Sequence, residues 1–336
     1  MTLILAIESS CDETACAVVK DGKEILSNIV SSQINVHTLY GGVVPEVASR
    51  IHVENISTVI TEALEKATVT MDDIDAIAYT KGPGLIGSLH VGVQAAKTLA
   101  WVYHKPLLPI NHMTGHIYAN AFVSELQFPL MALVVSGGHT ELVWMKNDWN
   151  FEVIGTTQDD AIGEAYDKVA RVLGLGYPGG PVVDKLAKNG KPHYSLPTPK
   201  TNDPYNFSFS GLKTAVLQLK EREERKGNVV SPEDLVYAFQ ETALTTMVSK
   251  TIAAVKEYKP KMIVLAGGVA ANSRLREMMK EEMSKVEGTE LLIPPMWCCT
   301  DNAAMIGASG QIAYNHKCFG DLDAAADPNM LMPGEK

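Results

Sequence analysis

Two histidines in this 336-residue chain have the spacing of a metal-ligand pair. His112 and His116 stand four positions apart at the head of an apolar helix predicted to continue over 117–123. Side chains at positions i and i+4 lie on one helical face, so both imidazoles could reach a single cation. The H-E-x-x-H zinc proteases share this spacing, but Met113 stands where those enzymes carry their glutamate base. A purely structural histidine pair is the alternative.

A carboxylate near the end of the chain could complete such a site. Asp301 lies just before an alanine- and glycine-rich segment, 303–313, that predicts a helix. An aspartate in this place is a common N-cap, and it could equally be a distant third metal ligand. The sequence leaves both roles open at this point.

A second candidate site is the glycine turn at 136–140, with an apolar strand predicted on each side. Gly137 and Gly138 allow a phosphate oxygen or another backbone to approach closely, and successive N–H groups in such a turn form an anion-binding concavity. Ser136 and Thr140 add hydroxyl donors. The alternative is an ordinary β-hairpin turn.

A third group of polar side chains fills the turn 8–13, between strands predicted over 3–7 and 15–19. Its carboxylates would repel a bare phosphate, so the turn suits a hydrated metal ion or a phosphate-linked water. Asp12 and Glu13 are the candidates for a general base.

Two strand–glycine–helix units, at 74–103 and 262–283, are predicted to position an anionic ligand. Such units present backbone amides and the positive end of a helix. Neither is a Walker A loop, because no Gly-Lys-Ser/Thr ends the glycine run. Asn272 in the second unit could read a base or a ribose. Asp167 and Asp184 bracket a glycine–proline loop that suits ribose hydroxyls, with a solvated acidic face as the alternative.

The two halves of the chain use these parts in the same order, which indicates an internal repeat. The second half carries about 60 extra residues between its units, expected as an insertion over 156–232. We therefore predict an α/β protein of two related domains, 1–125 and 126–336, that face a nucleotide cleft.

Composition narrows the class of protein. A net charge of −10 argues against a general basic coat for nucleic acid, although a local basic patch stays open. No apolar run approaches the roughly 20 residues of a membrane span, and the N-terminus lacks the basic region of a signal peptide. Five cysteines, an odd number without framework spacing, favour a reducing compartment. We expect a cytoplasmic location and no membrane contact.

Ten segments between Ile7 and Gly310 together carry a resemblance to a known family. They are IESSCDETACAVV, GGVVPEVASR, KGPGLIGSLHVG, NHMTGH, SGGHTEL, GEAYDK, YPGG, FSFSGLK, AGGVAANSRLR and CTDNAAMIG. The combination resembles the ASKHA superfamily (actin, Hsp70 and sugar kinases). More narrowly, it resembles the TsaD/Gcp/Kae-type family of tRNA threonylcarbamoyltransferases, in its bacterial single-domain form.

The resemblance implies an acyltransferase. Such enzymes move a threonylcarbamoyl group from threonylcarbamoyl-AMP to the exocyclic amine of the adenosine 3′ of the anticodon, in tRNAs that read codons beginning with A. It implies one metal ion per chain, Fe(II) or Zn(II), on His112, His116 and Asp301. It also implies helper proteins, TsaB and TsaE. The substrate-binding positions that it implies are Val135, Ser136, Gly137, Gly138, His139, Asp167, Gly180, Asp184 and Asn272.

Three other functions stay open at the level of sequence. The histidine pair alone would suit a metalloprotease. The superfamily resemblance would also suit a small-molecule kinase, or a non-catalytic ATPase partner or chaperone.

Overall fold

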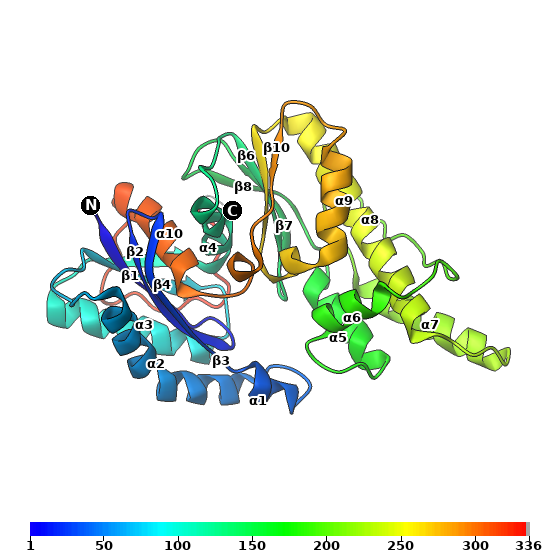
Figure 1. The fold of residues 1–336 in the computed structure, drawn as a ribbon, viewed down its shortest axis with the longest axis horizontal. Coiled ribbons are helices and arrows are strands. Elements are labelled where there is room, and N and C mark those ends of the chain that lie inside the picture. The colour runs from blue at the N-terminus through cyan, green and yellow to red at the C-terminus, as the bar shows by residue number, and fades with distance from the viewer. Residues whose placement is uncertain (334–336) are drawn as a thin grey trace. The chain divides into compact units, whose positions relative to one another are not determined.

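The computed structural model describes residues 1–333, which form two compact units (Figure 1). The first unit comprises 1–126, 147–151 and the described chain from Pro294 onward. The second comprises 127–146 and 152–293.

A five-stranded mixed sheet with strand order β3-β2-β1-β4-β5 is the centre of the first unit. An antiparallel β1–β2–β3 meander continues into β4 and β5, which run parallel to β1. The elements of this unit are β1 (Leu3–Glu8), β2 (Glu13–Lys20), β3 (Glu24–Ser32), α1 (Ile34–Thr38), α2 (Pro45–Ala67), β4 (Ala76–Gly82), α3 (Ile86–Tyr103), β5 (Leu107–Asn111), α4 (His112–Tyr118), η1 (Ala119–Phe122), η3 (Met296–Cys298) and α10 (Ala303–Asn315).

Alternate residues of β1 bury themselves on opposite faces of this sheet, which explains its uninterrupted apolar run. Leu5 and Ile7 join a core with Val59 of α2 and Val93 of α3. Residues 4 and 6 join a separate core with the alanine-rich face of α10. The site elements are therefore fixed from both sides of the sheet.

The second unit repeats this topology with strand order β10-β9-β6-β7-β8. Here β6 pairs antiparallel with β7 and parallel with β9, as β1 pairs with β2 and β4. The elements are β6 (Leu130–Val135), β7 (Thr140–Met145), β8 (Phe151–Thr156), α5 (Ile162–Val172), α6 (Gly179–Ala187), α7 (Ser210–Arg225), α8 (Pro232–Tyr258), β9 (Met262–Ala266), η2 (Gly268–Ala271), α9 (Ser273–Met283) and β10 (Glu290–Leu292). The internal repeat and the α/β class predicted from the sequence are confirmed.

The course of the chain differs from the predicted division into 1–125 and 126–336. From Pro294 onward the described chain belongs to the first unit, because α10 packs on the first sheet. A Cβ added at Gly307 would lie 2.5 Å from Val19 Cγ2, and one at Gly310 would lie 2.7 Å from Ala78 Cβ. Glycine at these positions lets the helix backbone approach the strands, and this brings the residues before α10 to the ends of β1 and β5.

The predicted insertion, 156–232, lies in the second unit and contains α5, α6 and α7. Between α6 and α7 the chain forms no helix or strand, and the segment 191–209 contains four prolines. Asp159 anchors the end of this loop by accepting hydrogen bonds from the N–H groups of Phe209 at 2.7 Å and Ser210 at 3.2 Å. Among the helices of residues 1–333, none is long and apolar enough to cross a membrane.

Candidate functional site

The two histidines lie at the start of a helix that follows a strand directly. Asn111 ends β5 and caps α4, because its side-chain oxygen accepts hydrogen bonds from the N–H groups of Met113 at 2.8 Å and Thr114 at 3.3 Å. Capping at this position starts the helix at His112. His112 and His116 then lie on one face of α4, and both are buried.

Asp301 is not the cap of α10. Asn302 has that role, since its side-chain oxygen accepts a hydrogen bond from the Met305 N–H at 3.1 Å. The Asp301 carboxylate is thereby available for another partner. Of the two roles that the sequence left open for Asp301, the N-cap role therefore falls to Asn302, and the ligand role stays a prediction.

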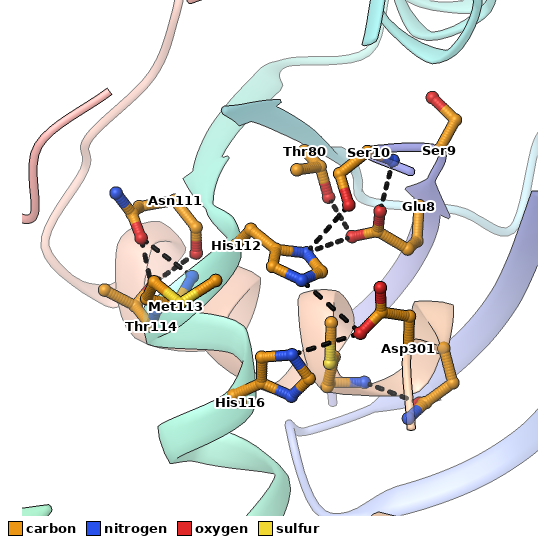
Figure 2. Close-up of polar contacts among 12 residues, drawn as sticks. Glu8, Ser9, Ser10, Thr80, Asn111, His112, Met113, Thr114, His116 and Asp301 are labelled. Carbon is orange, nitrogen blue, oxygen red and sulfur yellow. Dashed lines mark hydrogen bonds and ion pairs between the residues drawn. The ribbon is translucent and has the colours of Figure 1, made fainter. Parts of the chain in front are cut away.

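Both imidazoles converge on one carboxylate oxygen (Figure 2). The Oδ1 of Asp301 lies 3.1 Å from Nε2 of His116 and 3.4 Å from Nε2 of His112. The two rings are 4.7 Å apart and nearly perpendicular. Ligand atoms about 3.4 Å apart are what bonds of roughly 2.1 Å at tetrahedral angles require.

The buried groups of this cluster stabilise one another's charged forms. Burial alone would lower the pKa of His112, but the negative charges of Glu8 and Asp301 raise it well above its ordinary value of 6.5. Burial alone would raise the pKa of Asp301, but the charges and hydrogen bonds of His112 and His116 keep it far below its ordinary value of 3.8. The site is therefore built around an ionised Asp301, as a cation requires.

The cluster also fits a metal ion, both in the chemistry of its ligand atoms and in the unsatisfied ring nitrogens of His116. Two imidazoles and one carboxylate form the 2-His-1-carboxylate set that suits Fe(II), and the same donors bind Zn(II). The Nε2 of His116 faces Asp301 without hydrogen-bond geometry, and its Nδ1 has no hydrogen-bond partner among the described residues. Buried polar atoms in this condition are rare, and a ligand at Nε2 accounts for one of them.

Glu8 belongs to this cluster, although the sequence did not single it out as a site residue. It ends β1, is fully buried and lies 2.9 Å from Nδ1 of His112. These two residues are 104 positions apart in the chain. The sequence signal was its place at the start of the polar turn 8–13, which was expected to suit a hydrated metal ion.

The turn that carries Asp12 and Glu13 is fixed by its neighbours. His52 of α2 is buried and lies 3.0 Å from the Cys11 carbonyl oxygen and 2.7 Å from Thr14 Oγ1. Burial, together with the charges of Asp301 and Asp12, raises the pKa of Glu13 to about 9. Without a bound cation, Glu13 therefore holds a proton at neutral pH, and the negative charge of Asp301 is one cause of this shift.

The glycine turn of the second unit is a tight, self-bonded β6–β7 connection. The Ser136 N–H donates to the His139 carbonyl at 2.9 Å, and the His139 N–H donates to Ser136 Oγ at 3.1 Å. A Cβ added at Gly137 or Gly138 would meet no described atom within 4 Å. The two predicted roles of this turn, β-hairpin connection and anion-binding site, are thus compatible, because the turn leaves open space next to its two glycines.

Two other glycines let neighbouring elements press against this turn. A Cβ on Gly163, in the first turn of α5, would lie 2.6 Å from the Ser136 carbonyl oxygen. A Cβ on Gly267, after β9, would lie 2.5 Å from the Val135 carbonyl oxygen. The N-terminal end of α5 and the β9 glycine run therefore meet at the end of β6.

The remaining positions implied by the resemblance gather around the starts of α6 and α9. Asp167 accepts a hydrogen bond from the Gly179 N–H at 2.7 Å, next to Gly180. Asp184 accepts bonds from the N–H and the hydroxyl of Ser273 at 3.2 and 3.0 Å. Burial raises the pKa of Asp167 above its ordinary value of 3.8.

The side-chain amide of Asn272 already makes three hydrogen bonds within the protein, more than expected of an amide free to bind a ligand. Its oxygen caps α9 by accepting from the Leu275 N–H at 2.9 Å. Its amino group donates to Gln240 at 3.0 Å and to Tyr166 at 3.3 Å. Tyr166 and Gln240 are members of this group that the sequence did not indicate.

The structure therefore brings the predicted site residues together as two sets. His112, His116 and Asp301, with Glu8, form one set in the first unit. The nine predicted substrate-binding positions, Val135 to Asn272, lie in the second unit. The nucleotide cleft expected between the two halves stays a prediction.

Comparisons with known proteins identify the family. A family model described as TsaD, tRNA N6-adenosine threonylcarbamoyltransferase, matches residues 24–308. A Bacillus cereus protein of the same name is 54% identical over 330 residues, which cover 98% of this chain and 96% of that protein. A Bacillus subtilis relative with this name is 55% identical over 328 residues, covering 97% and 95% of the two chains.

A solved structure of more distant sequence shares the fold. Component A of the (R)-2-hydroxyglutaryl-CoA dehydratase of Acidaminococcus fermentans is 17% identical, with a TM-score of 0.54, and the match covers 95% of this chain and 100% of that one. At this identity the likeness bears on the fold alone. The fold is the duplicated α/β architecture of the ASKHA type, as the motifs predicted.

Proposed function

Because this chain belongs to the TsaD family of tRNA N6-adenosine threonylcarbamoyltransferases, we propose that its donor is threonylcarbamoyl-AMP and its acceptor the adenosine 3′ of the anticodon in tRNAs that read codons beginning with A. The observation that carries the proposal is the 54% identity to such a transferase across 98% of the chain. The enzyme is an acyltransferase that acts on tRNA.

The second unit is proposed to bind the adenylate. The N–H groups of Gly137 and Gly138 lie in a turn with open space above it, and the positive end of α5 adjoins that turn. Asp184 has lone pairs left for ribose hydroxyls after accepting from Ser273. Asn272 contributes by holding the start of α9 in place, since its own hydrogen bonds are taken.

The first unit is proposed to hold one Fe(II) or Zn(II) ion on His112, His116 and Asp301. When bound there, the cation supplies Lewis-acid polarisation of an oxygen of the reacting group. Three protein donors leave coordination positions open, as catalytic sites do.

The protein's own groups must position the acceptor and handle one proton. An adenine amine is a weak nucleophile, so holding it against the carbamoyl carbon supplies much of the rate. The amine loses a proton as the new C–N bond forms, and adenylate leaves. Asp12 and Glu13 remain the proposed candidates to accept that proton.

Partner proteins of the TsaB and TsaE kind are proposed to assist. The support in this chain is the apolar surface on α3 of the first unit, where the Trp101 side chain is 68% exposed next to exposed Val102 and Tyr103. Together with the net charge of −10, this favours tRNA binding at a local patch or with help from partners. The proposed location is the cytoplasm.

The test of the proposed function is tRNA-dependent release of AMP from threonylcarbamoyl-AMP, with the partner proteins present. We expect release only with an unmodified tRNA that reads codons beginning with A, and none with a tRNA that lacks the acceptor adenosine. Proteolysis of a peptide library, or phosphoryl transfer from ATP to sugars, would instead favour the metalloprotease or the kinase. ATP hydrolysis with no modified tRNA would favour the ATPase partner.

A further inference from the structure

The metal cluster has a fourth member whose contacts point to a role of its own. Glu8 is fully buried at the end of β1, and both of its carboxylate oxygens face donors. Its Oε1 accepts from the Ser10 N–H at 2.5 Å, and its Oε2 accepts from Thr80 Oγ1 at 2.5 Å and faces His112 Nδ1 at 2.9 Å (Figure 2).

These contacts decide which nitrogen of His112 carries a proton when a cation is bound. An ionised carboxylate only accepts hydrogen bonds, so the ring must present Nδ1–H to Glu8. The lone pair is then on Nε2, the nitrogen that lies 3.4 Å from Asp301 Oδ1. Ser10 Oγ, 3.2 Å from the same Nδ1, gives a second contact on that side of the ring.

We propose that Glu8 is a positioning residue for the metal centre, which holds His112 in the tautomer and orientation that direct Nε2 to the cation. This inference rests on the proposed metal site. Carboxylate partners of metal-bound histidines raise ligand basicity and fix the ring, and their loss costs roughly 10- to 100-fold in metal affinity. The inference adds Glu8 to the residues that control the reaction, because it contacts the ligand His112 without itself being a ligand.

His116 offers a contrast within the same cluster. Its Nδ1 is buried and has no hydrogen-bond partner among residues 1–333, so no described group orients its ring from behind. The positioning of the pair therefore depends on His112 and Glu8.

The variant Glu8→Gln tests the proposal with little change of shape. The amide has one acceptor oxygen and one donor NH₂ group, whereas Glu8 faces donors at both oxygens. If the NH₂ faces His112, the ring is forced to present Nδ1 as an acceptor, and Nε2 loses its lone pair. If the NH₂ group faces Ser10 instead, it lies against the Ser10 N–H, and neither donor has an acceptor.

Asp75→Asn is the matched control. Asp75 accepts a hydrogen bond from the Leu3 N–H at 2.8 Å, at the opposite end of β1 from Glu8. The control variant therefore makes the same carboxylate-to-amide change at a site away from the cluster. Chelator competition would give the zinc affinity of each folded protein, and the visible spectrum of the cobalt-loaded form would report the ligand field. We expect Glu8→Gln to weaken zinc binding about 10- to 100-fold and to change the cobalt spectrum, and Asp75→Asn to change neither.

Equal zinc affinity of Glu8→Gln and wild type would overturn the role of Glu8 and leave the metal site intact. Absence of zinc binding by wild type would overturn the metal site and the role of Glu8 together. Should Glu8→Gln fail to fold, ¹⁵N NMR of the zinc-loaded wild-type protein decides. The proposal requires a protonated Nδ1 and a zinc-bound Nε2 on His112, and the reverse assignment would refute it.

Discussion

At the scale of single residues, the proposed metal centre depends on one carboxylate oxygen. Two imidazole nitrogens approach Asp301 Oδ1 to within 3.4 Å, and the neighbouring Asn302 relieves Asp301 of capping α10. Binding and helix capping are thus divided between adjacent side chains. Variants of the two residues should therefore differ in their effect on metal binding.

Asp301→Asn should remove metal binding and activity while the protein stays folded. The amide keeps the shape of the side chain but loses the negative charge that both histidines face. We expect metal affinity to fall by more than the roughly 100-fold seen for loss of an outer partner, and the metal-free protein to melt at a lower temperature, because Asp301 is one of the two charges that stabilise protonated His112. Metal analysis after gel filtration, with thermal unfolding, measures both.

Asn302→Ala is the companion variant. Loss of a helix N-cap costs about 1 kcal/mol of unfolding free energy, so stability should drop while the metal ligands stay in place. Metal loss in Asn302→Ala, or retained transfer in Asp301→Asn, would contradict this division of roles.

The raised pKa of His112 predicts the pH dependence of metal binding. In the metal-free protein His112 holds its proton at neutral pH, because Glu8 and Asp301 raise its pKa well above 6.5. A cation must displace that proton, so affinity should rise by about tenfold per pH unit up to the raised pKa. Stability of the metal-free protein has the opposite trend, since this contribution is present below pH 6.5 and is lost as pH rises through the raised value.

Calorimetric titration of zinc in buffers of different ionisation enthalpy would measure the protons released. We expect about one proton from His112 per zinc bound at pH 7. No release, with an affinity independent of pH from 6 to 8, would show that His112 is neutral before the metal binds.

At the scale of elements, the glycine turn between β6 and β7 is held against α5 with no room for a side chain. Gly163 faces the Ser136 carbonyl oxygen and Gly137 Cα, at 2.6 and 2.8 Å from an added Cβ. Both neighbours are backbone atoms, so they cannot move without the turn. The turn itself is open on its other side.

Gly163→Ala should therefore displace α5 from the turn. Overpacking of this kind costs roughly 1–3 kcal/mol, and we expect a lower unfolding free energy together with weaker adenylate binding. Gly211→Ala on α7 is the control, because its Cβ would meet no described atom within 4 Å. Equal stability of Gly163→Ala and wild type would mean that the turn and helix are less closely packed than described.

Gly137→Val should separate binding from folding. The added side chain enters open space above the turn, so the melting temperature should stay near that of wild type. It occupies the place proposed for the phosphate, so affinity for an adenylate analogue should fall at least about tenfold, equivalent to about 1.4 kcal/mol. Unchanged affinity would place the phosphate elsewhere.

At the scale of the whole molecule, the duplication was readable from the sequence because it depends on local signals. Apolar strands, glycine turns and amphipathic helices recur in the same order, and each predicts its own element. The pairing of His112 and His116 on one helical face was readable for the same reason, since they are one helical turn apart. By contrast, the contact between Glu8 and His112 joins residues 104 positions apart and depends on the parallel placement of strands.

Local sequence signals also could not predict that the chain returns to the first unit at Pro294. The residues of α10 predict a buried helix, but which sheet buries it depends on how Gly307 and Gly310 fit against Val19 and Ala78. This return places Asp301 beside α4. The family resemblance could therefore imply Asp301 as the third ligand, but only the structure shows that it lies next to the two histidines.

The measurement that tests the central claim most directly is transfer of labelled threonylcarbamoyl from its adenylate to unmodified tRNA, with the partner proteins present. Wild type and His112→Ala would be compared, and the labelled nucleoside identified after digestion of the tRNA. We predict label on the adenosine 3′ of the anticodon with wild type and none above background with His112→Ala. Equal labelling by both proteins would contradict the role of the metal centre, and no labelling by wild type would contradict the proposed reaction.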